Sequence, residues 1–219
     1  MQNISKEDYL STIYKHRETD GTIKANQIAE DLSVSNAAVT DMLKKLAKDG
    51  YVDYKRYQGI KLTEDGEEYA KNMVRRHRIW EVFLNQIVGM PWDKVHEEAH
   101  NLEHGSSDDL INRMEVMLDF PAFDPHGDPI PSKDGILPKQ KKSKPLSLLK
   151  SKEKGKVIRV NDFDNSFLSY LSRIGVELGK EIQVKEKLEF DRSMLIGING
   201  KEINISNTLA ANIFVEEKK

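Results

Sequence analysis

Apolar residues in the first half of the chain recur with helical spacing. Val39, Leu43 and Leu46 follow one another at i, i+4 and i+7, which is typical of a helix with one buried face. The first ninety residues contain no proline, whereas six of the seven prolines lie between Pro121 and Pro145. This pattern predicts a helical front followed by an irregular middle segment.

The spacing changes again after Gly155, where short apolar stretches replace the helical pattern. The stretches cover residues 157–160, 182–190, 194–198, 203–205 and 213–215. Asn199-Gly200 separates two of them, and this pair suits a type I′ hairpin turn because both of its central residues need positive φ. The pattern predicts strands that form a small closed or half-closed barrel.

Residues 23–52 predict a helix-turn-helix. A short helix is expected to end near Leu32, a tight turn lies at Ser33-Val34, and Ser35 begins a second helix. Short side chains near the start of that helix let its backbone approach base edges, and an Ala or Thr methyl can contact a thymine methyl. The candidate DNA contacts on this helix are Ser35, Asn36, Ala37, Ala38, Thr40 and Lys44.

Two alternating stretches after this helix, 51–55 and 60–63, predict a β-hairpin wing. Lys55 and Arg56 in the wing add positive charge beside Lys44, as phosphate contacts require. The whole chain has 34 Lys plus Arg against 36 Asp plus Glu, a net charge of −2, so DNA binding depends on such local patches. A helical hairpin with solvated lysines is the alternative interpretation of this region.

Histidine and carboxylate side chains share helical spacing in the middle of the chain. The residues concerned are His77, Glu81, His96, His100, Glu103 and His104. The last four fall on one stripe of a helix that we expect to begin at Pro91, next to an apolar stripe of Val95, Ala99 and Leu102. So many lone pairs are costly to bury without a cation, so the stripe predicts a metal site. Because the chain has no cysteine, the ligands must be nitrogen, oxygen or thioether.

Two features of this region leave alternatives open. His96-Glu97-x-x-His100 has the H-E-x-x-H form of zinc metalloproteases, but no third histidine follows at the extended-motif spacing, so proteolysis is the less favoured hypothesis. Ser5-x-x-Asp8 is typical of a capping box, yet Asp8 also lies beside the apolar face of its helix, where it could be presented to a metal.

Taken together, these motifs resemble a known family. Asp8-Tyr9-Leu10, the winged helix, RRHRIWE, KVHEEAHNLEH and PHGDPIP resemble, in this order and over nearly the whole chain, the diphtheria toxin repressor family of metal-dependent transcriptional regulators. The resemblance implies a mainly α fold with a small β domain. It places a winged helix-turn-helix DNA-binding domain at 1–73, a helical dimerisation and metal-binding domain at 74–138, a basic linker at 139–153, and a FeoA-type barrel similar to Src-homology-3 domains at 154–219.

The resemblance also implies which residues bind metal. Asp8, His100, Glu103 and His104 match the principal site of the family, and His77, Glu81 and His96 match its ancillary site. Asp164 is the candidate ligand from the barrel. Manganese-dependent members commonly have Glu at the positions of Ser11 and His100, so the number of ions per subunit stays open.

These observations predict a homodimeric repressor rather than an enzyme. We expect it to bind a near-palindromic double-stranded DNA operator when Mn²⁺, or alternatively Fe²⁺, is bound. The resemblance implies that it controls genes of metal homeostasis. A constitutive DNA-binding protein with a structural metal is the rival hypothesis. The apolar runs are shorter than the ~18 residues of a membrane helix, and the first residues lack the apolar segment of a signal peptide. We therefore expect a cytoplasmic protein without a membrane partner.

Overall fold

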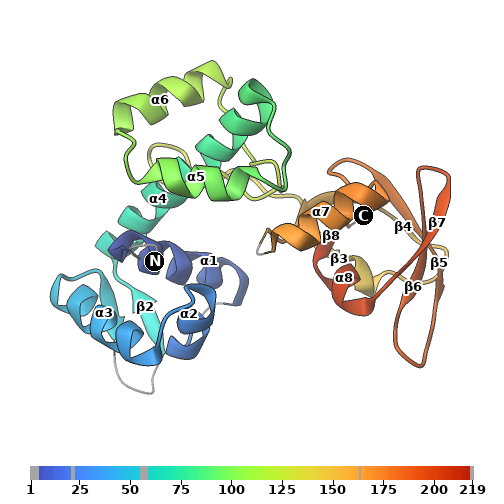
Figure 1. Ribbon diagram of the computed structural model, residues 1–219, viewed down its shortest axis with the longest axis horizontal. Helices are drawn as coiled ribbons and strands as arrows, with labels where there is room; N and C mark the ends of the chain where they lie inside the picture. The colour runs from blue at the N-terminus through green and yellow to red at the C-terminus, as the bar shows by residue number, and fades with distance from the viewer. Residues whose placement is uncertain (1–4, 21–22, 55–58, 163, 218–219) are drawn as a thin grey trace. The chain divides into compact units, whose positions relative to one another are not determined.

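The protein divides into two compact units, which are described separately. The structure is a computed structural model that describes residues 5–20, 23–54, 59–162 and 164–217 (Figure 1). The first unit comprises Met1–Arg76 with Pro131–Ile136, and the second comprises His77–Ile130 with Leu137–Lys219. Within the described residues, no helix is long and apolar enough to span a membrane.

The first unit is a winged helix-turn-helix. Its elements are α1 (Lys6–Asp20), α2 (Ala25–Asp31), α3 (Asn36–Lys48), β1 (Val52–Tyr54), β2 (Ile60–Leu62) and the first part of α4 (Glu64–Phe83). Val39, Leu43 and Leu46 of α3 are buried in one apolar core with residues of α1 and α2, which confirms the predicted stripe. β1 and β2 pair antiparallel, as the wing requires.

Local hydrogen bonds explain where these helices begin. Ser33 has φ 52°, so the chain turns sharply between α2 and α3. The Ser35 hydroxyl then accepts a hydrogen bond from the backbone N–H of Ala38 at 3.1 Å and caps α3. In the same way, Thr63 Oγ1 accepts from the N–H of Gly66 at 3.0 Å at the start of α4.

The second unit begins with helices. α4 continues into a π-helical turn (Leu84–Val88), and α5 (Val95–Glu103) and α6 (Asp108–Met117) follow. The helix that we expected to begin at Pro91 begins instead at Val95, because residues 91–94 form a turn in which the N–H of Lys94 bonds the carbonyl of Pro91. Val95 and Ala99 are buried as predicted, but Leu102 is 37% exposed and is not part of the buried stripe.

The rest of the second unit is a six-stranded antiparallel sheet with short helices. Its elements are β3 (Ser143–Pro145), a 3₁₀ turn (Leu146–Leu148), β4 (Lys154–Val160), α7 (Asn165–Ile174), β5 (Glu181–Lys187), β6 (Met194–Ile198), β7 (Lys201–Ile205), α8 (Asn207–Ala211) and β8 (Ile213–Glu216). The strand order is β3-β8-β4-β5-β6-β7. No pairing of β7 with β3 closes the sheet within the described residues, so the architecture is an open, Src-homology-3-like one rather than a closed barrel.

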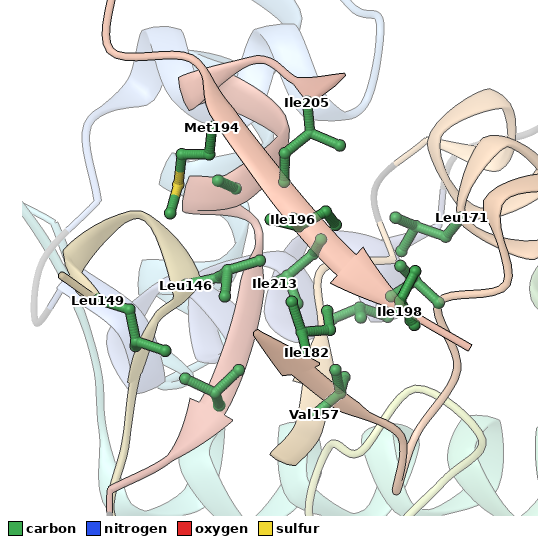
Figure 2. Packing of buried hydrophobic residues seen from close by; sticks show 14 of the residues in the cluster. Leu146, Leu149, Val157, Leu171, Ile182, Met194, Ile196, Ile198, Ile205 and Ile213 are labelled. Atoms are coloured by element: carbon green, nitrogen blue, oxygen red, sulfur yellow. The ribbon is translucent and has the colours of Figure 1, made fainter. Parts of the chain in front are cut away.

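The sequence patterns located most of this sheet but not all of it. Asn199 and Gly200 have φ of 49° and 77°, which confirms the predicted hairpin turn. β5 ends at Lys187 rather than at 190, because the N–H of Leu188 bonds the carbonyl of Ser193 and closes a turn there. The segment that we expected to be a basic linker contains β3, which pairs with β8, and its Leu146 is fully buried in the core (Figure 2).

Gly66 packs too closely against the wing for any side chain to fit. A Cβ atom there would overlap the carbonyl oxygen of Tyr51, which also accepts a hydrogen bond from the N–H of Thr63. We expect Gly66→Ala to lower the free energy of unfolding by about 2 kcal/mol or more, because backbone would have to move. A urea titration followed by circular dichroism measures this. Gly105→Ala is the control, since its Cβ would meet no atom within 4 Å; equal effects of the two substitutions would contradict the prediction.

Candidate metal centre and DNA-binding surface

Three side chains of the second unit converge on one point, and we call them the triad: His77, Glu81 and His96. α4 carries His77 and Glu81 one turn apart, and α5 carries His96. His77 Nε2 lies 3.1 Å from Glu81 Oε1 and 3.0 Å from His96 Nδ1, and His96 Nδ1 lies 3.1 Å from Glu81 Oε1. The structure therefore brings together the three residues assigned to the ancillary site.

The hydrogen bond made by His77 Nδ1 determines whether Nε2 of the same ring carries a hydrogen or a lone pair. His77 Nδ1 lies 2.7 Å from Glu103 Oε2, and because an ionised carboxylate only accepts, Nδ1 must be the donor. In the neutral ring, Nε2 then carries a lone pair. This lone pair faces a carboxylate oxygen and a second imidazole nitrogen, an arrangement that a cation or a proton must stabilise.

The spacing of the triad fits one face of an octahedral metal ion. Ligands about 2.1 Å from an ion and at right angles to one another lie about 3.0 Å apart. Two imidazoles and one carboxylate on one face of an octahedron are a common ligand set for divalent iron, and carboxylate ligands also suit manganese. The triad can therefore hold a divalent cation with its remaining positions open to other ligands.

Burial and charge oppose each other in the pKa values of the triad. Burial by itself would lower the pKa of His77, but the charge of Glu81 and the hydrogen bonds to Glu103 and Glu81 raise it to about 9. Burial would raise the pKa of the fully buried Glu81, but His77 and hydrogen bonds to the neighbouring imidazoles hold it well below its usual value. The carboxylate is therefore ionised, and a cation must replace a proton on His77 in order to bind.

A second cluster lies at the end of α5 and contains His100, Glu103 and His104. Glu103 Oε1 lies 3.0 Å from His100 Nδ1 and 3.4 Å from His104 Nε2. Burial would raise the pKa of Glu103, but hydrogen bonds to His100 and His77 lower it to about 2. Because its other oxygen bonds His77, this one carboxylate connects the second cluster with the triad.

Asp8 lies on α1 in the first unit, whereas His100, Glu103 and His104 belong to the second. Its Oδ2 accepts a hydrogen bond from the N–H of Ser5 at 2.6 Å, and its own N–H lies 3.4 Å from Ser5 Oγ. Asp8 therefore has the capping-box role that the Ser5-x-x-Asp8 spacing predicts.

The H-E-x-x-H string does not build one zinc site. His96 Nδ1 faces Glu81 and His77, whereas His100 Nδ1 faces Glu103. Glu97 between them is exposed. Both histidines of a metalloprotease motif must bind the same ion, so the protease hypothesis is wrong for this chain.

Two residues beside the triad were missed by sequence reasoning. His126 and Asp162 each place a ligand atom near Glu81. Asp164, the candidate from the barrel, instead caps α7 by accepting from the N–H of Ser166 at 2.7 Å. PHGDPIP contains His126 and so marked this loop, but nothing in the chain's spacing indicated that Asp162 would reach α4 and α5.

The helix-turn-helix exposes most of the predicted DNA contacts. Ser35, Asn36, Ala37, Ala38 and Lys44 are exposed at the start and along one side of α3. Thr40 is half-buried, and its hydroxyl donates to the carbonyl of Asn36 at 2.9 Å. Lys55 and Arg56 in the wing lie outside the described residues.

Comparison with known protein families assigns three domains to this chain. Family models match the iron dependent repressor N-terminal DNA binding domain at residues 3–60, the iron dependent repressor metal binding and dimerisation domain at residues 63–132, and the FeoA domain at residues 144–217.

Individual relatives extend this match. The HTH-type transcriptional regulator MntR of Bacillus pumilus is 37% identical over 120 residues, which cover 55% of this chain and 83% of the relative. The diphtheria toxin repressor of Corynebacterium diphtheriae is 27% identical over 222 residues and 96% of each chain. A solved structure of a manganese-dependent transcriptional repressor in complex with manganese is 34% identical, with a TM-score of 0.91 over 98% of this chain and 100% of that one. The chain therefore belongs to the diphtheria toxin repressor family, and it is a metal-dependent transcriptional repressor rather than an enzyme.

Proposed function

We propose that this chain is a homodimeric repressor that binds a near-palindromic operator when Mn²⁺ is bound, and that it controls genes of metal homeostasis. The single observation that carries the proposal is the triad, in which three acceptor atoms lie 3.0–3.1 Å apart. In this proposal one ion binds the triad. Another binds the second cluster together with Asp8.

The donor atoms support manganese as the physiological ion. Every proposed ligand is a carboxylate or an imidazole, and the chain has no cysteine to favour a softer metal. The solved manganese complex similar to this chain favours the same ion. Iron is the second candidate, because two of the matching family models describe iron dependent repressors.

Glu103 provides a direct route for coupling between the two ions. One of its oxygens accepts from His77 Nδ1, and the other faces His100 and His104. A cation on the second cluster would fix the carboxylate, which in turn fixes the His77 ring with its Nε2 toward the triad. We therefore infer that each ion favours binding of the other.

The proposed role of Asp8 explains how metal could control the DNA-binding domain. Asp8 precedes Tyr9 and Leu10, which are buried in the core that also holds α2 and α3. A cation shared by Asp8 and the second cluster would therefore restrain the whole helix-turn-helix. A helix-turn-helix that is already restrained loses less conformational freedom when it binds DNA. A coupling free energy of about 1–3 kcal/mol between metal binding and DNA binding is ordinary for such linkage.

Exposed apolar side chains in the helical part of the second unit support dimerisation. They are Ile87, Val88, Leu110, Val116, Met117 and Phe120. Exposed apolar patches commonly mark protein interfaces, and the family model for this segment describes a dimerisation domain. In a symmetric dimer the two α3 helices would read half-sites about one helical turn of DNA apart.

Metal dependence of DNA binding tests the function. We expect selection from a random duplex library in Mn²⁺ to enrich a two-fold symmetric sequence, and Mn²⁺ to tighten its binding about tenfold or more over EDTA in a gel shift. Asp8→Asn should lose most of this gain and keep its thermal stability, because an amide oxygen can still accept from the N–H of Ser5. Glu30→Gln, an exposed charge-matched control on α2, should keep the gain. Equal binding in EDTA would instead indicate a constitutive DNA-binding protein.

Metal binding at the triad should release a proton. Because the pKa of His77 is raised to about 9, its ring is protonated at pH 7 before metal binds, and the cation displaces that proton. We expect the apparent Mn²⁺ affinity to rise with pH between 6 and 8, with about one proton released per triad ion at pH 7. Calorimetry in buffers of different ionisation enthalpy measures the release. His77→Gln should remove it and His16→Gln should not; a pH-independent affinity would contradict the assignment.

Lys44 should contact a DNA phosphate. Its amine is solvent-exposed and lies 3.4 Å from the Asp41 carboxylate, a surface pair that contributes little by itself. We expect Lys44→Ala to weaken operator binding and to reduce the slope of log affinity against log salt by about one unit. Lys201→Ala removes an exposed charge in the sheet domain and should leave the slope unchanged. An unaltered slope in Lys44→Ala would show that this lysine touches no phosphate.

A further inference from the structure

Asp41 places a negative charge on the helix that the proposed function directs into the major groove of DNA. The sequence of α3 contains three lysines, which suit a polyanion, and one acidic residue, Asp41. The Asp41 side chain is 73% exposed. DNA phosphates repel a carboxylate, so an acid at this place weakens binding to every DNA sequence unless a base donates a hydrogen bond to it.

Asp41 lies on the side of α3 opposite the buried stripe. An α-helix turns by about 100° per residue, so Asp41 lies about 200° around the axis from the buried Val39. Ala37, one turn before Asp41, and Lys44, one turn after it, are exposed and lie within about 60° of it. The N-terminal part of a recognition helix contacts base edges, and Asp41 lies in the second turn of α3. Asp41 is therefore directed at the bases when this side of α3 enters the groove.

The hydrogen bonds of α3 make the Asp41 carboxylate the acceptor that can change partner. The hydroxyl of the preceding Thr40 donates to the carbonyl of Asn36 at 2.9 Å, so it is used within the helix. Asp41 Oδ1 lies 3.4 Å from Lys44 Nζ, and a surface pair of this kind contributes little to stability. When the Lys44 amine moves to a DNA phosphate, both Asp41 oxygens can accept hydrogen bonds from a base.

We propose that Asp41 selects a cytosine in each half-site by accepting a hydrogen bond from its N4 amino group. A carboxylate only accepts, and the major groove offers two kinds of donor, cytosine N4 and adenine N6. Adenine N6 lies between two acceptors, N7 of its own ring and O4 of the paired thymine, and both repel a carboxylate. Cytosine N4 has such an acceptor, guanine O6, on one side only. Cytosine is therefore the base that suits Asp41 best.

This inference rests on the proposed operator binding by α3 and adds to it the identity of one base pair in each half-site. It also gives the unfavourable charge of Asp41 a function. Repulsion from phosphates weakens binding to all sequences, whereas the hydrogen bond to cytosine strengthens binding to one, so a carboxylate at this position widens the difference between the operator and other DNA.

Parallel selections from a random duplex library in MnCl₂, with the unsubstituted chain and with Asp41→Asn, test the proposal. We expect one symmetric pair of positions to change from cytosine to adenine in Asp41→Asn, because an amide can accept from N6 and donate to N7 of adenine. The other positions should stay the same. Uniformly tighter binding by Asp41→Asn with an unchanged base preference would show repulsion alone and would overturn the proposal.

Asp49→Asn is the matched control, because Asp49 is an exposed acid at the C-terminal end of the same helix. It removes the same charge from α3 without changing the side that faces the bases. We expect Asp49→Asn to keep the preference for cytosine. The same change of preference in both variants would assign the effect to net charge and contradict a contact made by Asp41.

Binding to single operator duplexes measures the contact at the level of one atom. Replacing the selected C·G pair by A·T should weaken binding of the unsubstituted chain about fivefold or more, as an ordinary mismatch does, but should not weaken binding of Asp41→Asn. Replacing the cytosine by 2-pyrimidinone, which lacks the N4 amino group, should weaken the unsubstituted chain more than Asp41→Ala. Equal losses in these two proteins would show that Asp41 does not bind N4.

The outcomes separate this inference from the proposed function. If Mn²⁺ enriches a two-fold symmetric operator in which no position responds to Asp41→Asn, the inference is wrong and the proposed function stands. If no symmetric sequence is enriched, the proposed operator binding is contradicted and the inference is wrong as well.

Discussion

The arrangement of the second unit depends on the buried carboxylate of Glu81. Its Oε1 faces two imidazole nitrogens at 3.1 Å, and its Oε2 faces a third at 3.8 Å. A fully buried carboxylate is costly unless charge and hydrogen bonds compensate it. His77 and His126 donate through their other ring nitrogens to Glu103 and to the carbonyl of Trp92. These two imidazoles can therefore compensate Glu81 only as protonated rings or as partners in metal binding, so protons and metal ions would compete for the same positions. In the proposed function, this competition would make the fold of the second unit depend on the concentration of divalent cations.

The His77 ring connects the triad to the second cluster. Its Nε2 belongs to the triad and its Nδ1 donates to Glu103, so the tautomer that suits a metal ion is fixed by a residue of the second cluster. Two clusters joined by one hydrogen bond respond together more readily than two separate ones. In the proposed function, such coupling would sharpen the response of the repressor to a small change in metal concentration.

Several elements of the fold follow from patterns along the chain. The stripe of Val39, Leu43 and Leu46 is local in origin, as are the cap of Ser35 and the Asn199-Gly200 turn, and each is present as predicted. α7 was overlooked although local features were present: Leu168 and Leu171 recur at helical spacing between the Asp164 cap and Gly175, whose φ is 79°. β3 was overlooked for another reason, because its residues Lys144 and Pro145 carry no strand pattern and are ordered by pairing with β8.

The sequence by itself determined that the available ligands are carboxylates and imidazoles, and it determined which helical faces carry them. An i, i+4 spacing places His77 and Glu81 on one side of a helix whatever the rest of the chain does. Only the tertiary structure decided which imidazole faces which carboxylate. It directed His96 and His100 of one short helix to different clusters, and it brought Asp162 rather than Asp164 to Glu81. The physical reason is that these contacts join residues distant in the chain, and packing of β4 against the His126 loop, absent from any local pattern, sets their distances.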